Sequence, residues 1–162
     1  MDHYAFDAQI TAATPIGLST AGLRVDLSFT GTITEGPLAG SKVDGTDWLL
    51  IRHDGIGQIT VRERIIRDGR TAASLQFSGY VVPPITLPDL SELSAPDFPW
   101  PDIAFPLHGA SFCEAADKEI ASATATVYGV TGAVNLAQGT LRVAARSLAV
   151  SSPVEAVTIR DI

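Results

Sequence analysis

The chain has 162 residues, of which 46% are hydrophobic and 18% are charged. This composition is typical of a compact globular protein and excludes a disordered chain. Eleven Lys and Arg against eighteen Asp and Glu give a net charge of −7 without clustered cations, which counts against nucleic acid as a partner. No apolar stretch approaches the roughly 20 residues of a membrane span, and the first residues lack a signal-peptide pattern. We therefore expect a single domain over residues 1–162 that is cytoplasmic and binds no membrane.

Apolar and polar residues alternate with period two along most of the chain, as in strands with one buried face. Helical patterning is nearly absent, so the sequence predicts an all-β protein. The expected strands are Tyr4–Ala12, Leu23–Ile33, Asp47–His53, Ile56–Arg67, Thr71–Val82, Glu119–Val130 and Gly139–Val150, with a short strand near Val154–Ile159.

Turn residues separate these strands. Asp54-Gly55 and Asp68-Gly69 lie between alternating runs, where Gly accepts the positive φ of a hairpin turn. Gly36-Pro37 and Asp44-Gly45 mark further turns. Sequential hairpins of this kind favour an antiparallel up-and-down β-barrel of about eight strands, because closure hides the sheet edges. A β-sandwich is the alternative.

The segment Pro83–Pro106 interrupts the alternation. It holds seven of the ten prolines, no basic residue and many apolar side chains, among them Phe98 and Trp100. Such proline density forbids a central strand, and a loop of this length inside a compact domain is usually functional or disordered. We expect a lid over the barrel mouth or a subunit-contact arm, because so much apolar surface is unfavourable in water. A surface loop packed on the sheet is the alternative.

Common catalytic and cofactor motifs are missing from the sequence. It has no nucleophile elbow, phosphate-binding loop or dinucleotide fingerprint, so we expect no cofactor. His3, His53 and His108 are too far apart for a local metal-ligand spacing, so we expect no metal site. Cys113 has no electropositive neighbours and is interpreted as a packing residue.

Ionisable residues on the strands remain as candidates. Glu63 shares a strand face with Ile59, Val61 and Ile65, where an apolar residue is expected. If that face lines the barrel, burial raises the pKa of Glu63 and prepares it for acid or base chemistry. Otherwise Glu63 pairs with an arginine or faces solvent. If the opposite face points inward, Arg62 is expected to bind an anion or a carbonyl oxygen of the ligand.

Further candidates lie on neighbouring strands. Trp48 is expected in the core or the pocket wall, and His53 lies next to a turn, where a solvated position is favoured over a catalytic one. Tyr80 and Tyr128 lie on polar strand faces, where two phenols facing one space would bind an oxygenated apolar ligand. Surface strands of this composition also exist without any ligand.

A pattern over about Ile16–Val82 consists of the runs 36–40 and 45–55, Ile59, Val61, Arg62, Asp68 and Gly69. It resembles a bacterial family of uncharacterised single-domain proteins with a calycin-like β-barrel, and this resemblance implies a small barrel that forms a homodimer. The resemblance supports Asp47, Trp48, Arg52, Asp54 and Arg62 as family positions. Glu63 stands where that family tends to have Tyr, and Pro83–Pro106 replaces a shorter connection. Glycine turns near residues 129–132 and 139–141 resemble, more weakly, the allene oxide cyclase and dirigent barrels.

These observations suggest a cofactor-independent enzyme that transfers a proton on a small apolar oxygenated or aromatic molecule, as an isomerase, cyclase or lyase. Glu63 would be the acid or base, Arg62 or Arg52 would stabilise negative charge, and Asp47 would orient one of these cations. The alternatives are a carrier of a hydrophobic ligand and a dimeric structural module. The pocket residues expected in addition are Trp48, Phe77, Tyr80, Tyr128, Phe98 and Trp100.

Overall fold

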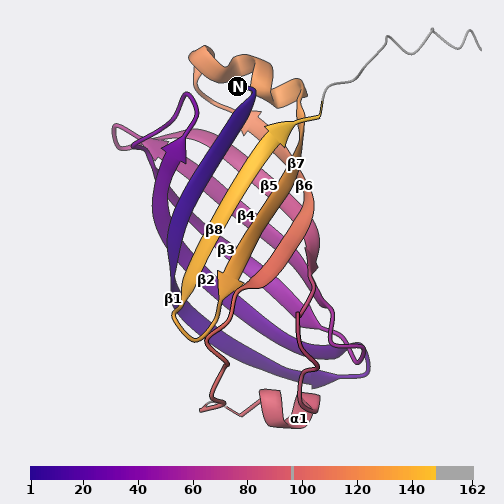
Figure 1. Ribbon diagram of the computed structural model, residues 1–162. Helices are drawn as coiled ribbons and strands as arrows, with labels where there is room; N and C mark the ends of the chain where they lie inside the picture. Colours follow the sequence, from indigo (N-terminus) through magenta and orange to yellow (C-terminus); the bar gives the residue numbers. More distant parts are fainter. Residues whose placement is uncertain (96, 149–162) are drawn as a thin grey trace, which may run out of the picture.

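The computed structural model describes residues 1–95 and 97–148, which contain a closed antiparallel β-barrel of eight strands. Each strand pairs with the next along the chain, and β1 closes the barrel by pairing with β8 (Figure 1). The predicted antiparallel barrel is therefore confirmed. The strands are β1 (His3–Ser19), β2 (Gly22–Glu35), β3 (Lys42–Ile51), β4 (Gly57–Arg67), β5 (Arg70–Val81), β6 (Phe105–Ala115), β7 (Val127–Asn135) and β8 (Thr140–Ser147).

Strand β4 shows which face of the sheet points inward. Ile59, Val61, Glu63 and Ile65 are buried, whereas the alternate residues Arg62 and Arg64 are exposed. The same alternation on the other strands fills the barrel with Phe, Leu, Val and Ile side chains. Burial of this apolar face holds the strands in register, because a shift by one residue would expose it.

The two ends of the barrel are covered by different segments (Figure 1). At one end, the connection between β5 and β6 carries the short helix α1 (Leu90–Leu93). At the other end lie the N-terminus and a 3-10 segment, η1 (Lys118–Ala125), with Ile120 and Ala123 buried in the core cluster. Within the described residues, no helix is both long and apolar enough to span a membrane.

The proline-rich connection packs on the core instead of extending into solvent. Leu90 and Leu93 of α1 are buried, and Leu87, Phe98 and Trp100 pack against the core cluster. The Phe98 and Trp100 rings meet edge to face with centroids 5.1 Å apart. Asp102 accepts hydrogen bonds from Asn135 Nδ2 and Gln138 Nε2 at 2.7 and 2.8 Å, which tie the connection to the turn between β7 and β8.

Two predicted elements were wrong. The expected turn at Asp44-Gly45 lies inside β3, where Gly45 makes room for the Phe29 ring: a Cβ there would lie 2.5 Å from Phe29 Cζ. The expected strand Glu119–Val130 is η1 over most of its length, and strand structure begins at Val127. Its buried residues are three apart, which suits a 3-10 turn better than a strand.

Strand β6 was not predicted, because its inner face alternates poorly. Gly109 pairs with Gly79 of β5, and the Phe77 ring covers both glycines: a Cβ on Gly109 would lie 2.5 Å from Phe77 Cε2. Pro106 at its beginning also obscures the strand pattern. The expected strand near Val154–Ile159 lies outside the described residues.

Candidate functional site

The inner faces of the strands enclose an apolar cavity. Its volume is about 70 Å³, room for a few waters or for an organic molecule of a few heavy atoms. Gly55, Leu87 and Phe105 line it at the end covered by α1, and Tyr4 and Glu63 also line it. Its few polar groups in an apolar wall resemble the lining of small-molecule sites, while its volume is well below the roughly 300–1,000 Å³ of sites for drug-sized ligands.

Glu63 is the most deeply buried acid of the cavity wall, with 6% of its surface exposed. It pairs in register with Gly45 of β3 and Leu75 of β5, so the backbone of β4 directs its side chain into the barrel. No hydrogen bond or ion pair to another described residue satisfies its carboxyl group. Burial therefore raises the pKa of Glu63 to about 8, and the carboxyl group is mostly neutral at pH 7.

Asp47 is the second carboxyl group of the cavity wall. Its side chain accepts a hydrogen bond from the backbone N–H of Thr60, while Oδ1 is buried and has no partner among the described residues. Pairing between β3 and β4 passes from Asp47–Val61 to Leu50–Gln58, so the Thr60 amide lies at an interruption of the ladder. Burial, reinforced by the charge of Asp26, raises the pKa of Asp47 to about 7.

Asp47 and Glu63 are diagonal neighbours on the inner face of two paired strands. Gly45 lies opposite Glu63 and Asp47 opposite Val61, which places the two carboxyl-bearing residues roughly 7–8 Å apart. No Lys, Arg or His is among the described residues that line the cavity. The wall therefore holds two acids with raised pKa values that no cation of the cavity wall neutralises.

A polar cluster lies next to Glu63 inside the barrel. The Tyr4 hydroxyl donates a hydrogen bond to Ser111 Oγ at 3.3 Å, and burial and the nearby Glu63 both raise the pKa of Tyr4. Burial also raises the pKa of the Cys113 thiol to about 11, in agreement with a packing role. Sequence reasoning missed Tyr4 and Ser111. Tyr4 lies on the same strand face as Phe6 and Ala8, and this pattern indicates that its side chain points inward. No sequence pattern indicates the position of Ser111.

Tyr128 and Tyr80 do not face one space, in contrast to our expectation. Tyr128 is fully buried, donates a hydrogen bond to the Met1 carbonyl oxygen at 2.6 Å and meets Tyr4 edge to face at 5.6 Å. Tyr80 is 49% exposed on the outer face of β5. The strand that carries Tyr128 begins after η1, so its alternation is not in phase with the residues before it.

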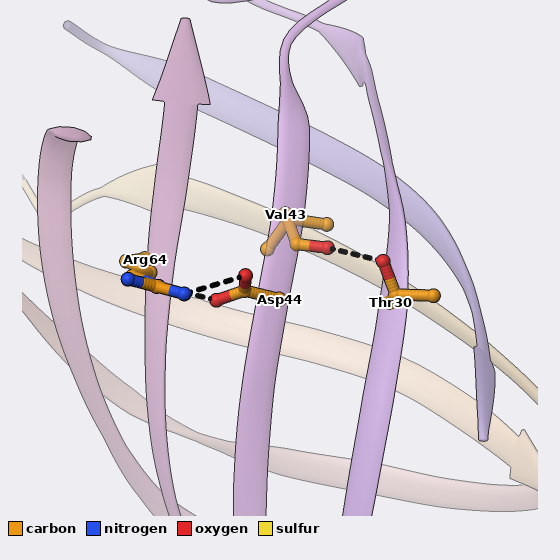
Figure 2. Close-up of polar contacts among 4 residues, drawn as sticks. All are labelled: Thr30, Val43, Asp44 and Arg64. Carbon is orange, nitrogen blue, oxygen red and sulfur yellow. Dashed lines mark hydrogen bonds and ion pairs between the residues drawn. The ribbon is translucent and has the colours of Figure 1, made fainter. Parts of the chain in front are cut away.

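The arginines are not brought to Glu63. Arg62 and Arg64 alternate with Glu63 along β4 and point outward, and Arg64 forms a two-point ion pair with Asp44 at 2.7 and 3.0 Å (Figure 2). In the same view, Thr30 Oγ1 donates a weak hydrogen bond to the Val43 carbonyl oxygen at 3.4 Å. The expected stabilisation of negative charge by Arg62 has no geometric support in this arrangement.

Arg52, His53 and Trp48 also lie outside the cavity. Arg52 pairs with Asp54 at 2.6 Å, and Asp54 Oδ1 accepts from the Ile56 amide, so this Arg-x-Asp-Gly sequence builds the hairpin turn. His53 is exposed in the same turn. Trp48 is 43% exposed, with the Arg24 guanidinium 5.6 Å from its ring centre. Asp47 therefore has neither Arg52 nor Arg62 beside it in the cavity.

Of the expected pocket residues, Phe77 lines the cavity, and Phe98 and Trp100 lie in the connection that covers one end. Trp100 also meets Phe105, which lines the cavity, edge to face at 6.3 Å. The structure thus brings together Glu63, Asp47 and Phe77 around one space. In the described ranges, no group of three or more His, Cys, Asp or Glu side chains is placed to hold a metal ion.

No protein-family model matches the chain, and no curated protein matches it in sequence. Solved structures are similar in fold. A protein of unknown function from Clostridium acetobutylicum ATCC 824 has 16% identity and a TM-score of 0.67, covering 92% of this chain and 100% of its own. A beta-barrel like protein from Acinetobacter baumannii AYE has 19% identity and a TM-score of 0.64, with coverage of 90% and 92%. An enzyme from Penicillium herquei has 15% identity and a TM-score of 0.52, with coverage of 91% and 96%.

These similarities show that the chain shares its fold with a protein of unknown function, with a beta-barrel like protein and with a protein described as an enzyme. At identities below 20%, the structural similarities establish the fold alone, so a function has to be argued from the residues of the site.

Proposed function

We propose that this protein is an enzyme that transfers a proton on a small apolar carbonyl compound bound in the barrel, as in an isomerisation, cyclisation or elimination. The observation that carries the proposal is the pair of cation-free carboxyl groups, Asp47 and Glu63, in one apolar cavity. Buried acids without partners destabilise a fold, and such groups concentrate at functional sites.

The two acids have complementary roles in this reaction. Glu63, neutral near pH 7, donates a hydrogen bond to the carbonyl oxygen, and Asp47, partly ionised at the same pH, removes a proton from the adjacent carbon. The electron pair of the broken C–H bond moves into the C=C bond of an enol, whose oxygen takes the Glu63 hydrogen. Return of a proton to carbon from Asp47, while the Glu63 carboxylate takes back the enol O–H hydrogen, restores the ketone and both acids. The chain itself supplies both groups, without an added cofactor.

Proton exchange with solvent tests the proposal without knowledge of the natural substrate. Small ketones such as acetone and butanone are incubated with the protein in D2O at pH 7.5, and NMR measures the loss of their α-hydrogens. We expect faster exchange than in buffer for a ketone that binds, and loss of this acceleration in Glu63→Gln. Glu114→Gln, on the exposed outer side of β6, is the matched control and keeps it. Ketones that bind but exchange no faster than in buffer would refute the proposal.

A carrier of a small hydrophobic ligand is the second candidate. It is favoured by the almost entirely apolar lining and by the connection that packs Leu87 against the cavity. As a carrier, the protein binds apolar molecules with and without a carbonyl group equally well, and Phe77→Trp, which fills the cavity, abolishes binding. The exchange experiment separates the two candidates, because a carrier moves no proton.

A further inference from the structure

The charge of the cavity wall is of one sign. In addition to burial, Glu63 raises the pKa of Tyr4 on β1 and of the Cys113 thiol on β6, and Asp26 on β2 raises the pKa of Asp47. The N-terminal ammonium group lowers the pKa of Cys113, but Met1 is not among the described residues that line the cavity, and the other groups are acids. The arginines of β4 are turned outward, and Arg64 is engaged with Asp44 on the outer surface (Figure 2). An anionic ligand would therefore meet repulsion in the cavity, and a cation would meet none.

The cavity also has unused hydrogen-bond acceptors. Glu63 is more than nine-tenths buried, contacts the cavity and has no partner among the described residues. Asp47 Oδ1 is likewise buried without a partner. The Tyr4 hydroxyl hydrogen is directed to Ser111. A ligand that carries several N–H donors satisfies both carboxyl groups, whereas a ketone carries none and leaves Asp47 Oδ1 unpaired.

We propose that the cavity binds small apolar amines in their protonated form, with the ammonium group between Asp47 and Glu63 and the hydrocarbon part against Phe77 and the aliphatic wall. This inference uses the cavity of the proposed function, but it does not depend on catalysis. It names a ligand class that the same two acids select by charge.

Binding is linked to a proton. Glu63 is mostly protonated at pH 7, so pairing with an ammonium ion requires its O–H bond to break and its proton to pass to solvent. The ammonium keeps its own three hydrogens and donates them to the carboxylates. Such charge-assisted hydrogen bonds are strong in an apolar surrounding, which offsets the loss of water around the amine.

Isothermal titration calorimetry with three small molecules of similar size tests the inference: ethylamine, ethanol and acetate. We expect ethylamine to bind roughly ten- to a hundredfold more tightly than ethanol, and acetate not to bind. Titrations at pH 7 in two buffers of different ionisation enthalpy should show proton release with ethylamine alone. Glu63→Gln and Asp47→Asn should each remove most of this preference, whereas the exposed control Glu114→Gln should retain it.

A measurement on the unchanged protein protects the test against a variant that fails to fold. Between pH 5.5 and 8, the affinity for ethylamine should rise as the two acids ionise, while that for ethanol should stay constant. Ethanol binding as tightly as ethylamine, or a flat pH profile for the amine, would overturn the inference. Ketone exchange is unaffected by that result, so the failure of one proposal is distinguishable from the failure of the other.

Discussion

The burial of Glu63 predicts that the protein is less stable at alkaline than at mildly acidic pH. The pKa of Glu63 is 4.5 in the unfolded chain and about 8 in the fold, so the folded state holds one more proton between these values. The stabilising contribution of the neutral acid is fully present below pH 4.5, and it is lost as the pH rises through 8. Asp47, with a pKa raised from 3.8 to about 7, acts in the same direction.

The magnitude follows from the linkage of proton binding to folding. Each pKa unit corresponds to about 1.4 kcal/mol, so Glu63 should lower the free energy of unfolding by about 3 kcal/mol between pH 5.5 and 7.5. For a domain of this size, that difference corresponds to a decrease in Tm of roughly 10 °C. Asp47 adds to the decrease, mainly at the lower end of this range.

Urea unfolding of wild type and Glu63→Gln at several pH values measures this contribution. The variant has no titrating group at this position. Between pH 5.5 and 7.5, its free energy of unfolding should therefore fall less steeply with pH than that of wild type, by about 1.4 kcal/mol per pH unit. Glu114→Gln, exposed on β6, should follow the wild-type profile. Parallel profiles for wild type and Glu63→Gln would refute the view that Glu63 is buried as a neutral acid.

Three further variants test the construction of the barrel. Phe77→Ala should enlarge the cavity and destabilise the fold by about 3–5 kcal/mol in urea unfolding, because the ring fills space over two paired glycines; a loss below about 1 kcal/mol would contradict its packing role. Gly45→Ala places a Cβ 2.5 Å from the Phe29 ring and 2.9 Å from Glu63 Cβ, so it should lower the free energy of unfolding by about 1–3 kcal/mol. An unchanged Tm would argue against this close contact. Asp102→Ala removes both acceptor contacts of the connection between β5 and β6, so limited proteolysis should cut residues 83–104 faster than in wild type while global stability changes little; equal cleavage rates would contradict the proposed attachment.

The fold was largely predictable because six of its strands alternate strongly enough to show a buried face. Leu23, Val25, Leu27 and Phe29 are one example, and all four are buried in the barrel. Strand β6 was missed where Gly109 replaces an apolar residue, because the Phe77 ring from the neighbouring strand fills the space instead. Packing of this kind depends on contacts between strands, which one strand's own sequence does not contain.

The site was predictable in part. The interruption of an apolar face identified Glu63, and the structure places this side chain in the cavity. Successive residues of a strand point to opposite faces, so the alternation that turns Glu63 inward turns Arg62 outward. Neighbouring residues of one regular strand therefore cannot both point into the cavity. Asp47 was found through the family pattern, but its position beside Glu63 depends on the register of β3 against β4. That register joins residues from two strands, and no single motif specifies it.

The stability of the barrel and the chemistry of its cavity oppose each other at one place. A leucine or methionine at position 63 would fill the apolar wall without the cost of a buried, unpartnered carboxyl group. The sequence instead places Gly45 opposite Glu63, and this glycine leaves room for both the acid and the Phe29 ring. Asp47 repeats the cost on the adjacent strand, with one oxygen buried and unpaired. Two buried carboxyl groups that face the same cavity without a compensating cation are difficult to explain as packing. They are expected of a wall that exchanges protons with a bound molecule or pairs with its charge.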